Sequence, residues 1–306
     1  GVKTALFPLH TWQPDAYAES PTSVTAYISA LVSTAAAYAL FRVIYTVFTP
    51  AFDAAVPTAL DVLVVLASVS VVVGSVLAVL QSDLKRMLAY SSVAQFGLVV
   101  AGFAVVNQTA ALGGLVHLVG HGVMKAGLFV AVGGLATVAG GRTVDDLAGI
   151  ADRAPIVSAA FAVLAFALVG VPPAVGFAGK WHIVLGAVEA GRWIVAGVAV
   201  VSTLLTLAYF ARVLERLYFR DAPAAAGVAE RPDAATAADT DAALTADGSG
   251  SGGAAAADDN PVDAVPTVPP QARVVVVAAA VAAVVLGVFA TDLIAVLEPV
   301  VEVSFQ

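Results

Sequence analysis

Long apolar stretches dominate the sequence and constrain its fold more than any other feature. A helix needs about 20 mostly apolar residues to cross a lipid bilayer. The stretches that reach this length are residues 22–48, 58–80, 87–106, 111–139, 193–219 and 273–297. Strands usually run only about four to eight residues, so these stretches predict helices. We therefore expect an all-α polytopic membrane protein folded as a helical bundle.

The overall composition agrees with a membrane protein and excludes several other classes. Hydrophobic residues make up 60% of the chain and charged residues only 12%, whereas soluble domains carry about a quarter charged residues. The absence of cysteine excludes disulfides and cysteine-ligated metal or redox sites. A net charge of −8 argues against nucleic acid as a partner. Because the chain begins with Gly1 rather than Met, we expect a partial chain whose missing part lies before residue 1.

A seventh apolar segment, residues 155–188, is interrupted by the sequence GVPPAVGFAGK. Prolines and glycines free backbone groups that are tolerated at membrane depth only where protein buries them or a cavity solvates them. Lys180 follows the interruption directly, and a charge at a broken span is typical of ion sites in transporters. Residues 1–12 have the pattern of the tail of an earlier span, and Lys3 stands there close to several prolines. We predict a second broken helix at that point.

Basic residues predict the orientation, because Lys and Arg near span ends favour the cytoplasm. When successive spans cross the membrane in alternate directions, most of these basic residues fall on one side of it. These residues are Lys85, Arg86, Arg142, Arg153, Arg216, Arg220, Arg231 and Arg273. That side is predicted to be cytoplasmic and the C-terminus to lie outside. Residues 221–271, rich in Ala, Gly, Ser, Pro and Asp, are predicted to be a disordered acidic cytoplasmic linker. Lys85 and Arg86 fit a topology anchor as well as a functional role.

Three ionisable side chains recur in the stretch 111–139, at His117, His121 and Lys125. Each step of four residues turns the helix by about 400°. Over the two steps the three side chains therefore drift only about 80° around the helix and rise roughly 12 Å, so they share one face. Charges inside a span cost several kcal/mol and therefore face a protein interior or a water-filled path. Histidine titrates near neutral pH, so the row can pass protons. Two alternatives are hydrogen-bonded histidines with a lysine that reaches the interface, and a zinc site, although a third ligand is missing.

Four motifs in the order of the chain resemble a known family. They are FPLHTWQPDAYAESPTSVTAYISA, QSDLKRMLAYSSVAQFG, HLVGHGVMKAGLF and GVPPAVGFAGKW. Together they resemble the antiporter-like proton-conducting subunits shared by Mrp-type sodium/proton antiporters, respiratory complex I and membrane-bound hydrogenases. The likeness covers residues 1–220, and the linker and the last apolar stretch carry little of it.

The resemblance implies a bundle with two inverted five-helix repeats, each containing a discontinuous transmembrane helix. Residues 1–48 would be the end of a truncated first repeat, with a broken-helix tail and one span. Residues 58–219 would be the complete second repeat, residues 221–271 the linker, and residues 273–297 a terminal transmembrane helix.

The resemblance also implies a proton path along the membrane midplane. Lys3 and Lys180 match the lysines of the family's two broken helices, and Lys125 matches the lysine that follows the histidine pair His117 and His121. The glutamate that pairs with the first lysine belongs to a helix upstream of Gly1.

A further departure is Thr34, where some family members carry a lysine. There, Ser33, Thr34 or water would have to continue the path. The stretch ISALVSTAAAYALFRV and a single terminal helix most resemble the D-type subunit of Mrp antiporters.

We therefore expect a proton-translocating subunit of a multi-subunit cation/proton antiporter in the plasma membrane, with sodium as the exchanged cation. Its partners would be other membrane subunits, protons, sodium and the bilayer, and it would hold no cofactor and no metal. The alternative is a proton-pumping subunit of a complex I-type NADH:quinone oxidoreductase or membrane hydrogenase, with the redox groups on partner subunits. A third hypothesis is a non-conducting fragment that only packs against partners.

Overall fold

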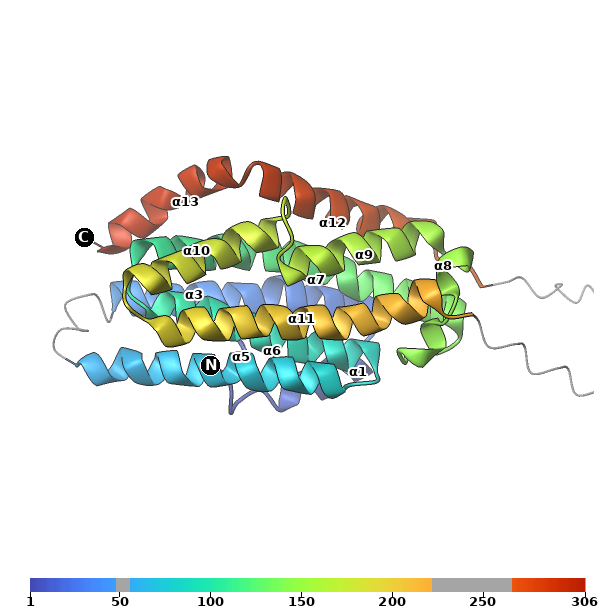
Figure 1. Cartoon of the computed structure of the whole chain (residues 1–306), viewed down its shortest axis with the longest axis horizontal. Coiled ribbons are helices and arrows are strands. Elements are labelled where there is room, and N and C mark those ends of the chain that lie inside the picture. The colour runs from blue at the N-terminus through green and yellow to red at the C-terminus, as the bar shows by residue number, and fades with distance from the viewer. Residues whose placement is uncertain (48–55, 222–265, 306) are drawn as a thin grey trace, which may run out of the picture.

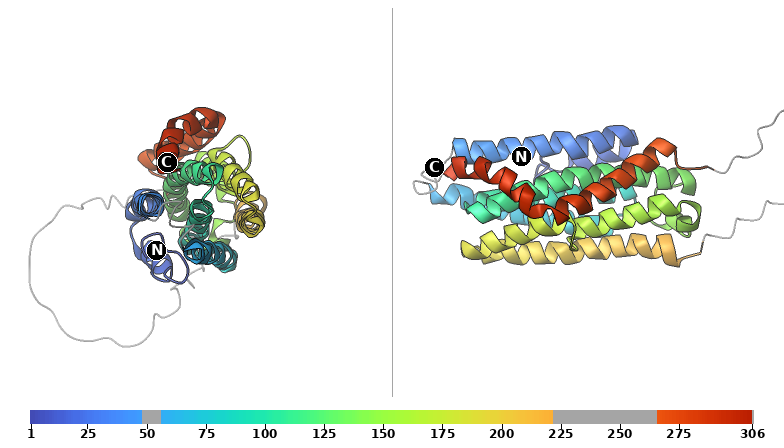
Figure 2. Two further views of the ribbon diagram at one scale, coloured as in Figure 1. Left: turned by 90° about the vertical axis from the view of Figure 1, so that its left-hand side faces the viewer. Right: turned by 90° about the horizontal axis from the view of Figure 1, so that it is seen from above.

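A computed structural model describes residues 1–47, 56–221 and 266–305 of the chain. The described residues form a bundle of long, nearly parallel helices, seen from the side in Figure 1 and from one end in Figure 2. Within these ranges there is no β-strand, only an isolated bridge between Asp83 and Thr143. Six of the helices are long and apolar enough to cross a membrane. The all-α membrane fold expected from the sequence is confirmed.

The central helices follow the apolar stretches closely. They are α5 (Pro57–Leu80), α6 (Leu84–Ala104), α7 (Gln108–Ala139) and α11 (Trp193–Phe219). Helix α6 begins earlier than the predicted residue 87 because Asp83 caps it, its carboxylate accepting the Arg86 backbone N–H at 2.9 Å. Asn107 caps α7 in the same way, accepting from the Ala110 N–H at 3.0 Å. Polar capping residues, rather than the ends of the apolar runs, therefore set the helix starts.

The N-terminal part differs from the predicted tail of a span. Residues 1–11 form consecutive turns, and α1 (Trp12–Glu19) follows as a short helix. The next span runs from Thr22 to Thr46 as α2 (Thr22–Tyr27), a π-helical segment η1 (Ile28–Val32) and α3 (Ser33–Thr46). Single π turns inside α-helices are rare and often lie at functional sites.

The predicted interruption of the segment 155–188 is confirmed. Helix α9 (Pro155–Val169) ends at Gly170, which has a left-handed φ of 99°, and α10 (Val175–Glu189) begins after the turn. Gly176, in the first turn of α10, is required beside this break, because a Cβ there would lie 1.9 Å from the Ala167 carbonyl oxygen. The two half-helices lie end to end along one side of the bundle (Figure 1). The short η2 (Asp145–Leu147) and α8 (Ile150–Arg153) connect α7 to α9.

The C-terminal segment differs from the single helix expected over residues 273–297. It forms α12 (Pro270–Val288) and α13 (Ala290–Phe305), separated at Phe289, and Figure 2 shows the bend between them. Close packing accompanies this break, because a Cβ at Gly287 would lie 1.9 Å from the Pro173 carbonyl oxygen. Helix α12 thus contacts the turn between α9 and α10. Most of the predicted linker 221–271 lies outside the described residues.

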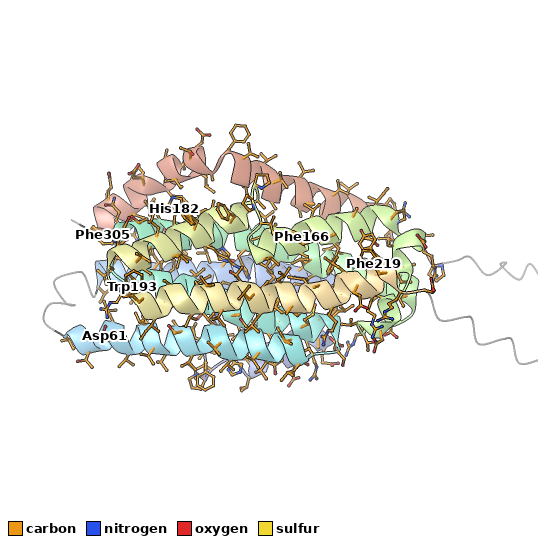
Figure 3. All side chains as sticks on the ribbon, in the orientation of Figure 1. Asp61, Phe166, His182, Trp193, Phe219 and Phe305 are labelled. Atoms are coloured by element: carbon orange, nitrogen blue, oxygen red, sulfur yellow. The ribbon has the colours of Figure 1, made fainter. Side chains whose placement is uncertain are left out.

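The core lies around α6 and α7, whose inner faces are buried by neighbouring helices, whereas the outer helices expose apolar residues. Phe166, Trp193 and Phe219 are 43%, 68% and 82% exposed and lie on the outside of the bundle (Figure 3). Large exposed apolar side chains around a bundle of this hydropathy fit contact with lipid.

Ion pairs concentrate where helices end. Arg142 contacts Asp83 at 2.6 Å, and Arg216 contacts Asp145 at 3.0 Å. These residues join the start of α6, the connection after α7 and the end of α11, so the basic residues assigned to one side do gather at one end of the bundle. Arg192 and Asp61 pair at the other end, at 2.6 Å. Arg231 lies outside the described residues.

Candidate functional site

The row of ionisable side chains on α7 is enclosed by the protein. His117, His121 and Lys125 are 0%, 1% and 0% exposed, respectively. The centroids of the two imidazole rings lie 6.4 Å apart. The spacing of four residues therefore does place all three on an interior face, as the sequence predicted.

Lys125 is held by helix α6. Its Nζ donates to the Leu88 carbonyl oxygen at 2.7 Å and forms a close hydrogen bond with Ser91 Oγ. The ammonium group also lies 5.9 Å from the centroid of the Phe129 ring, within cation–π range. The alternative in which Lys125 extends to the membrane interface is wrong, because its ammonium group ends inside the bundle.

The two histidines have different surroundings. His117 Nε2 and Gln95 Oε1 lie 2.9 Å apart, with His117 as donor in the tautomer that protonates Nε2. His121 packs edge-on against Phe96, with ring centroids 4.7 Å apart. Neither ring nitrogen of His121 has a hydrogen-bond partner within the described part of the chain. Buried polar atoms of this kind are usually satisfied by ordered water.

Lys180 occupies the break between α9 and α10. Its Nζ donates to the carbonyl oxygens of Leu168 at 2.8 Å and Val169 at 3.0 Å. These carbonyl groups belong to the last turn of α9, where no following helical N–H group donates to them. The negative end of the helix dipole also lies there. The broken span therefore supplies the acceptors that hold a buried ammonium group.

Close helix contact brings Lys180 to the row on α7. A Cβ at the neighbouring Gly179 would lie 2.6 Å from His117 Cβ, and one at Gly113 would lie 2.5 Å from the Ile183 backbone nitrogen. Glycine thus allows α7 and α10 to approach backbone to backbone. Lys180 also lines a cavity of about 260 Å³ between α10 and α11, beside Phe177 and Trp181.

Lys3 lies apart from this row. It is exposed in the N-terminal turns, where it lines a shallow cavity of about 400 Å³ with Tyr27 and Leu31. The structure brings together Lys180, His117, His121 and Lys125, and it leaves Lys3 outside that group. The role of Lys3 stays a prediction.

Several polar residues near the row were not singled out from the sequence. Ser91 and Gln95 are fully buried on α6 and contact Lys125 and His117. Their four-residue spacing inside an apolar helix is the signal that could have indicated them. Another buried polar group joins α1 to α3, where Gln13 Nε2 donates to the Tyr17 hydroxyl at 2.9 Å and Tyr17 lies 3.1 Å from Ser33 Oγ.

The ionisable side chains of this site are hydrogen-bonded to neutral groups. Among the described residues, no Asp or Glu is buried, so carbonyls, hydroxyls and an amide surround the lysines and histidines. No three His, Asp or Glu side chains in that part of the chain are placed to hold a metal ion. The arrangement is suited to exchanging protons, because its lysines and histidines are not fixed by carboxylate partners.

Comparison with known proteins is consistent with this geometry. Residues 1–206 match the family described as NADH:quinone oxidoreductase/Mrp antiporter, TM. The chain is 47% identical over 232 residues to NADH-quinone oxidoreductase subunit N of Desulforudis audaxviator (strain MP104C), covering 76% of this chain and 46% of that protein.

Solved structures give the same result. The Mrp complex from Dietzia sp. DQ12-45-1b contains a chain with a TM-score of 0.81 and 27% identity, covering all of this chain and 57% of that one. A chain of respiratory complex I from Thermus thermophilus with bound aureothin has a TM-score of 0.69 and 26% identity, covering 96% of this chain and 56% of that one. The chain spans about half the length of the curated relatives it matches. It belongs to the NADH:quinone oxidoreductase/Mrp antiporter membrane family.

Proposed function

We propose that the chain is a proton-translocating membrane subunit of a redox-driven, complex I-type assembly. The observation that carries the proposal is the buried row of lysines and histidines, whose hydrogen-bond partners among the described residues are all neutral. A buried ion pair holds a charge in place, and breaking it costs about 3–5 kcal/mol. Lysines held by carbonyl and hydroxyl groups, by contrast, can bind and release a proton without leaving a carboxylate unpaired.

The proposed path runs from Lys180 through His117 and His121 to Lys125. Gly179 brings Lys180 beside His117, and the two histidines follow one another on α7. Their ring separation is too long for a direct hydrogen bond, so a water molecule bridges them in this proposal. Beyond Lys125, the Tyr17–Ser33 pair offers a continuation, since Tyr17 packs on Phe129 at 5.5 Å. Lys3 would act near the exposed end of this continuation.

The domain assignment and the orientation belong to the same proposal. Residues 58–219 are assigned as a complete five-helix repeat, and residues 1–48 as the end of another. The end of the bundle that carries Lys85, Arg142 and Arg216 is assigned to the cytoplasm by the bias of basic residues. The protein would then lie in the plasma membrane among other membrane subunits.

A redox-driven assembly is preferred over a sodium/proton antiporter because of the relatives. The sequence motifs alone favoured the D-type antiporter subunit, whereas the relative at 47% identity is a subunit N of an NADH-quinone oxidoreductase. The antiporter remains the second candidate, since the chain of the Mrp complex superposes over all of this chain with a TM-score of 0.81.

The test uses the assembled complex in inside-out membrane vesicles, with Lys125→Ala and Lys180→Ala introduced separately. Addition of an electron donor and a quinone should acidify the lumen in the parent complex and fail to do so in either variant. Arg220→Gln is the control, because Arg220 pairs with Glu215 at the end of α11. Sodium-driven proton exchange without an electron donor would favour the antiporter. Unchanged acidification in both variants would reject conduction and leave the non-conducting role.

A further inference from the structure

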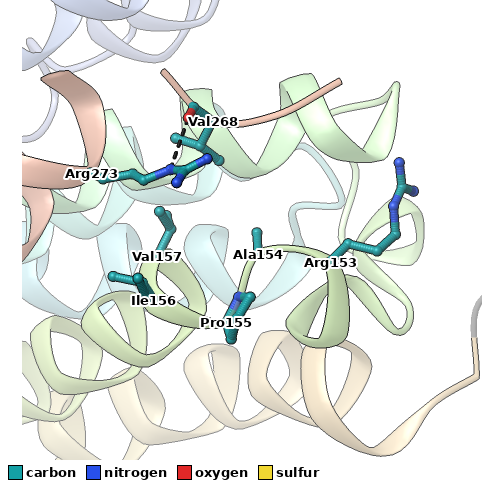
Figure 4. A pocket seen from close by; sticks show the side chains of 7 residues that line it. All are labelled: Arg153, Ala154, Pro155, Ile156, Val157, Val268 and Arg273. Atoms are coloured by element: carbon teal, nitrogen blue, oxygen red, sulfur yellow. Dashed lines mark hydrogen bonds between the residues drawn. The ribbon is translucent and has the colours of Figure 1, made fainter. Parts of the chain in front are cut away.

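Two arginines flank a small pocket at one end of the groove between α9 and α12. Arg153 ends α8 and Arg273 lies in the first turn of α12, and Figure 4 shows their side chains on opposite sides of the pocket. The pocket has a volume of about 150 Å³ and is otherwise lined by residues 154–157 and Val268. Both arginines are exposed, so the pocket opens to the surface.

An apolar groove continues from this pocket along the same two helices. It has a volume of about 550 Å³ and is lined only by Ile, Ala and Val side chains. Ile156 lines both cavities, and Val163, Val281 and Val285 extend the groove away from the arginines. Ile156 and Val281 are 57% and 56% exposed, so nothing in the described chain covers the groove. A polar head site and an apolar channel therefore adjoin each other.

The two arginines differ from the other cations at this end of the bundle. Arg142 and Arg216 each contact a carboxylate, whereas neither Arg153 nor Arg273 takes part in an ion pair among the described residues. Arg273 uses one donor, its Nε, on the Val268 carbonyl oxygen at 2.9 Å. A guanidinium group has five N–H donors, and it binds phosphate oxygens well. Charge complementarity thus calls for an anion between the two side chains.

We propose that this groove binds one anionic phospholipid, with its phosphate between Arg153 and Arg273 and an acyl chain along α9 and α12. Basic pockets between transmembrane helices at the cytoplasmic side are suited to anionic head groups. The apolar groove matches an acyl chain in chemistry and in its continuity with the head site. A helix of a partner subunit would fill the groove equally well, but it would leave the two guanidinium groups without an anion.

The bound lipid would lie next to the helix that carries Lys125. A Cβ at Gly127 of α7 would contact Leu164 of α9 and Ala279 of α12, so the floor of the groove rests on α7. Helix α12 also contacts the turn that precedes Lys180 through Gly287. A lipid between α9 and α12 would therefore stabilise the position of α12 against both parts of the site. This inference does not depend on whether the row conducts protons.

The test is native mass spectrometry of the intact complex, titrated with phosphatidylglycerol or phosphatidylcholine. In the double variant Arg153→Gln and Arg273→Gln, one phosphatidylglycerol site should weaken about 30-fold, since each basic side chain near the surface contributes roughly fivefold. Phosphatidylcholine binding should not change. Arg220→Gln is the matched control, because it removes a paired arginine at the same end and should leave the site intact.

A second variant separates the groove from the head site. Val281→Trp fills the apolar channel and should prevent phosphatidylglycerol from binding while both arginines remain. A phosphatidylglycerol with a photoreactive acyl chain should label residues 156–163 and 277–285 in the parent complex. Equal lipid binding in the double variant, complete displacement by inorganic phosphate, or labelling of another subunit alone by the photoreactive lipid would each overturn the proposal.

Discussion

The molecule holds its cations in two contrasting ways. At the ends of the bundle, Arg142, Arg192 and Arg216 are partly exposed and contact carboxylates at 2.6–3.0 Å. In the interior, Lys125 and Lys180 are enclosed, and within the described residues they hydrogen-bond to carbonyl and hydroxyl oxygens and to no carboxylate. Exposed pairs contribute little to stability and hold a fixed charge, whereas an unpaired interior cation is costly and is therefore kept for a function.

Replacing Lys125 by arginine should abolish proton translocation, with a loss of about 100-fold or more. Arginine keeps the positive charge but does not release its proton at physiological pH, so charge alone should not preserve activity. The measurement is donor-driven acidification of vesicles that contain the assembled complex, with Arg220→Gln as the control. Near-normal acidification in Lys125→Arg would show that the interior lysine serves only as a fixed charge.

Replacing Gly179 by alanine should destabilise the complex by about 1–3 kcal/mol, because the new Cβ would lie 2.6 Å from His117 Cβ. The thermal inactivation midpoint of the assembled complex measures this change. Gly197→Ala is the matched control, since no atom of the described residues lies within 4 Å of a Cβ at that position of α11. Equal midpoints for the two variants would mean that α7 and α10 are not held backbone to backbone.

Replacing Ser91 by alanine should lower proton translocation about tenfold, since the Lys125 ammonium group loses one of its two hydrogen-bond acceptors. Ser158→Ala is the control, because Ser158 on α9 is also fully buried but its hydroxyl has no hydrogen-bond partner among the described residues. Initial rates of vesicle acidification distinguish the two variants. The same rate in both would remove Ser91 from the site.

Replacing Arg142 by glutamine should have the smallest effect. Its side chain is 45% exposed, and its contacts with Asp83 at 2.6 Å and Glu19 at 3.8 Å should contribute at most about 1 kcal/mol. Added salt should reduce even this difference by screening. Thermal inactivation at low and high ionic strength provides the measurement, with proton translocation expected to stay at the parent rate. A large loss of translocation would place this end of the bundle in the conducting site.

The spans and the interior row were predictable because their signals are local and periodic. Apolar runs of sufficient length gave α5, α7 and α11, and the Pro-Gly interruption gave the break before Lys180. The four-residue spacing placed His117, His121 and Lys125 on one face without knowledge of the neighbouring helices. Their roles in conduction stay a prediction.

The remaining features depend on contacts between distant segments. Helix α12 ends at Val288, where its Gly287 contacts Pro173, although the apolar pattern continues past this point. Lys3 stands in an apolar run that forms turns instead of a helix. Ser91 and Gln95 are recognised as partners of the row only once α6 is packed on α7. No local pattern encodes these contacts.

The π-helical segment Ile28–Val32 determines the direction in which the side chains that follow it point around the helix axis. An α-helix turns about 100° per residue, and a π turn accommodates one extra residue, so everything after Val32 is rotated by about that angle. This rotation directs Ser33 to Tyr17 and lets Thr34 Oγ1 lie 3.7 Å from a Cβ position at Gly122, the residue after His121. Without the extra residue, the same side chains would face another quarter of the helix. Five residues thus decide which hydroxyl group of α3 faces α1 and which faces α7.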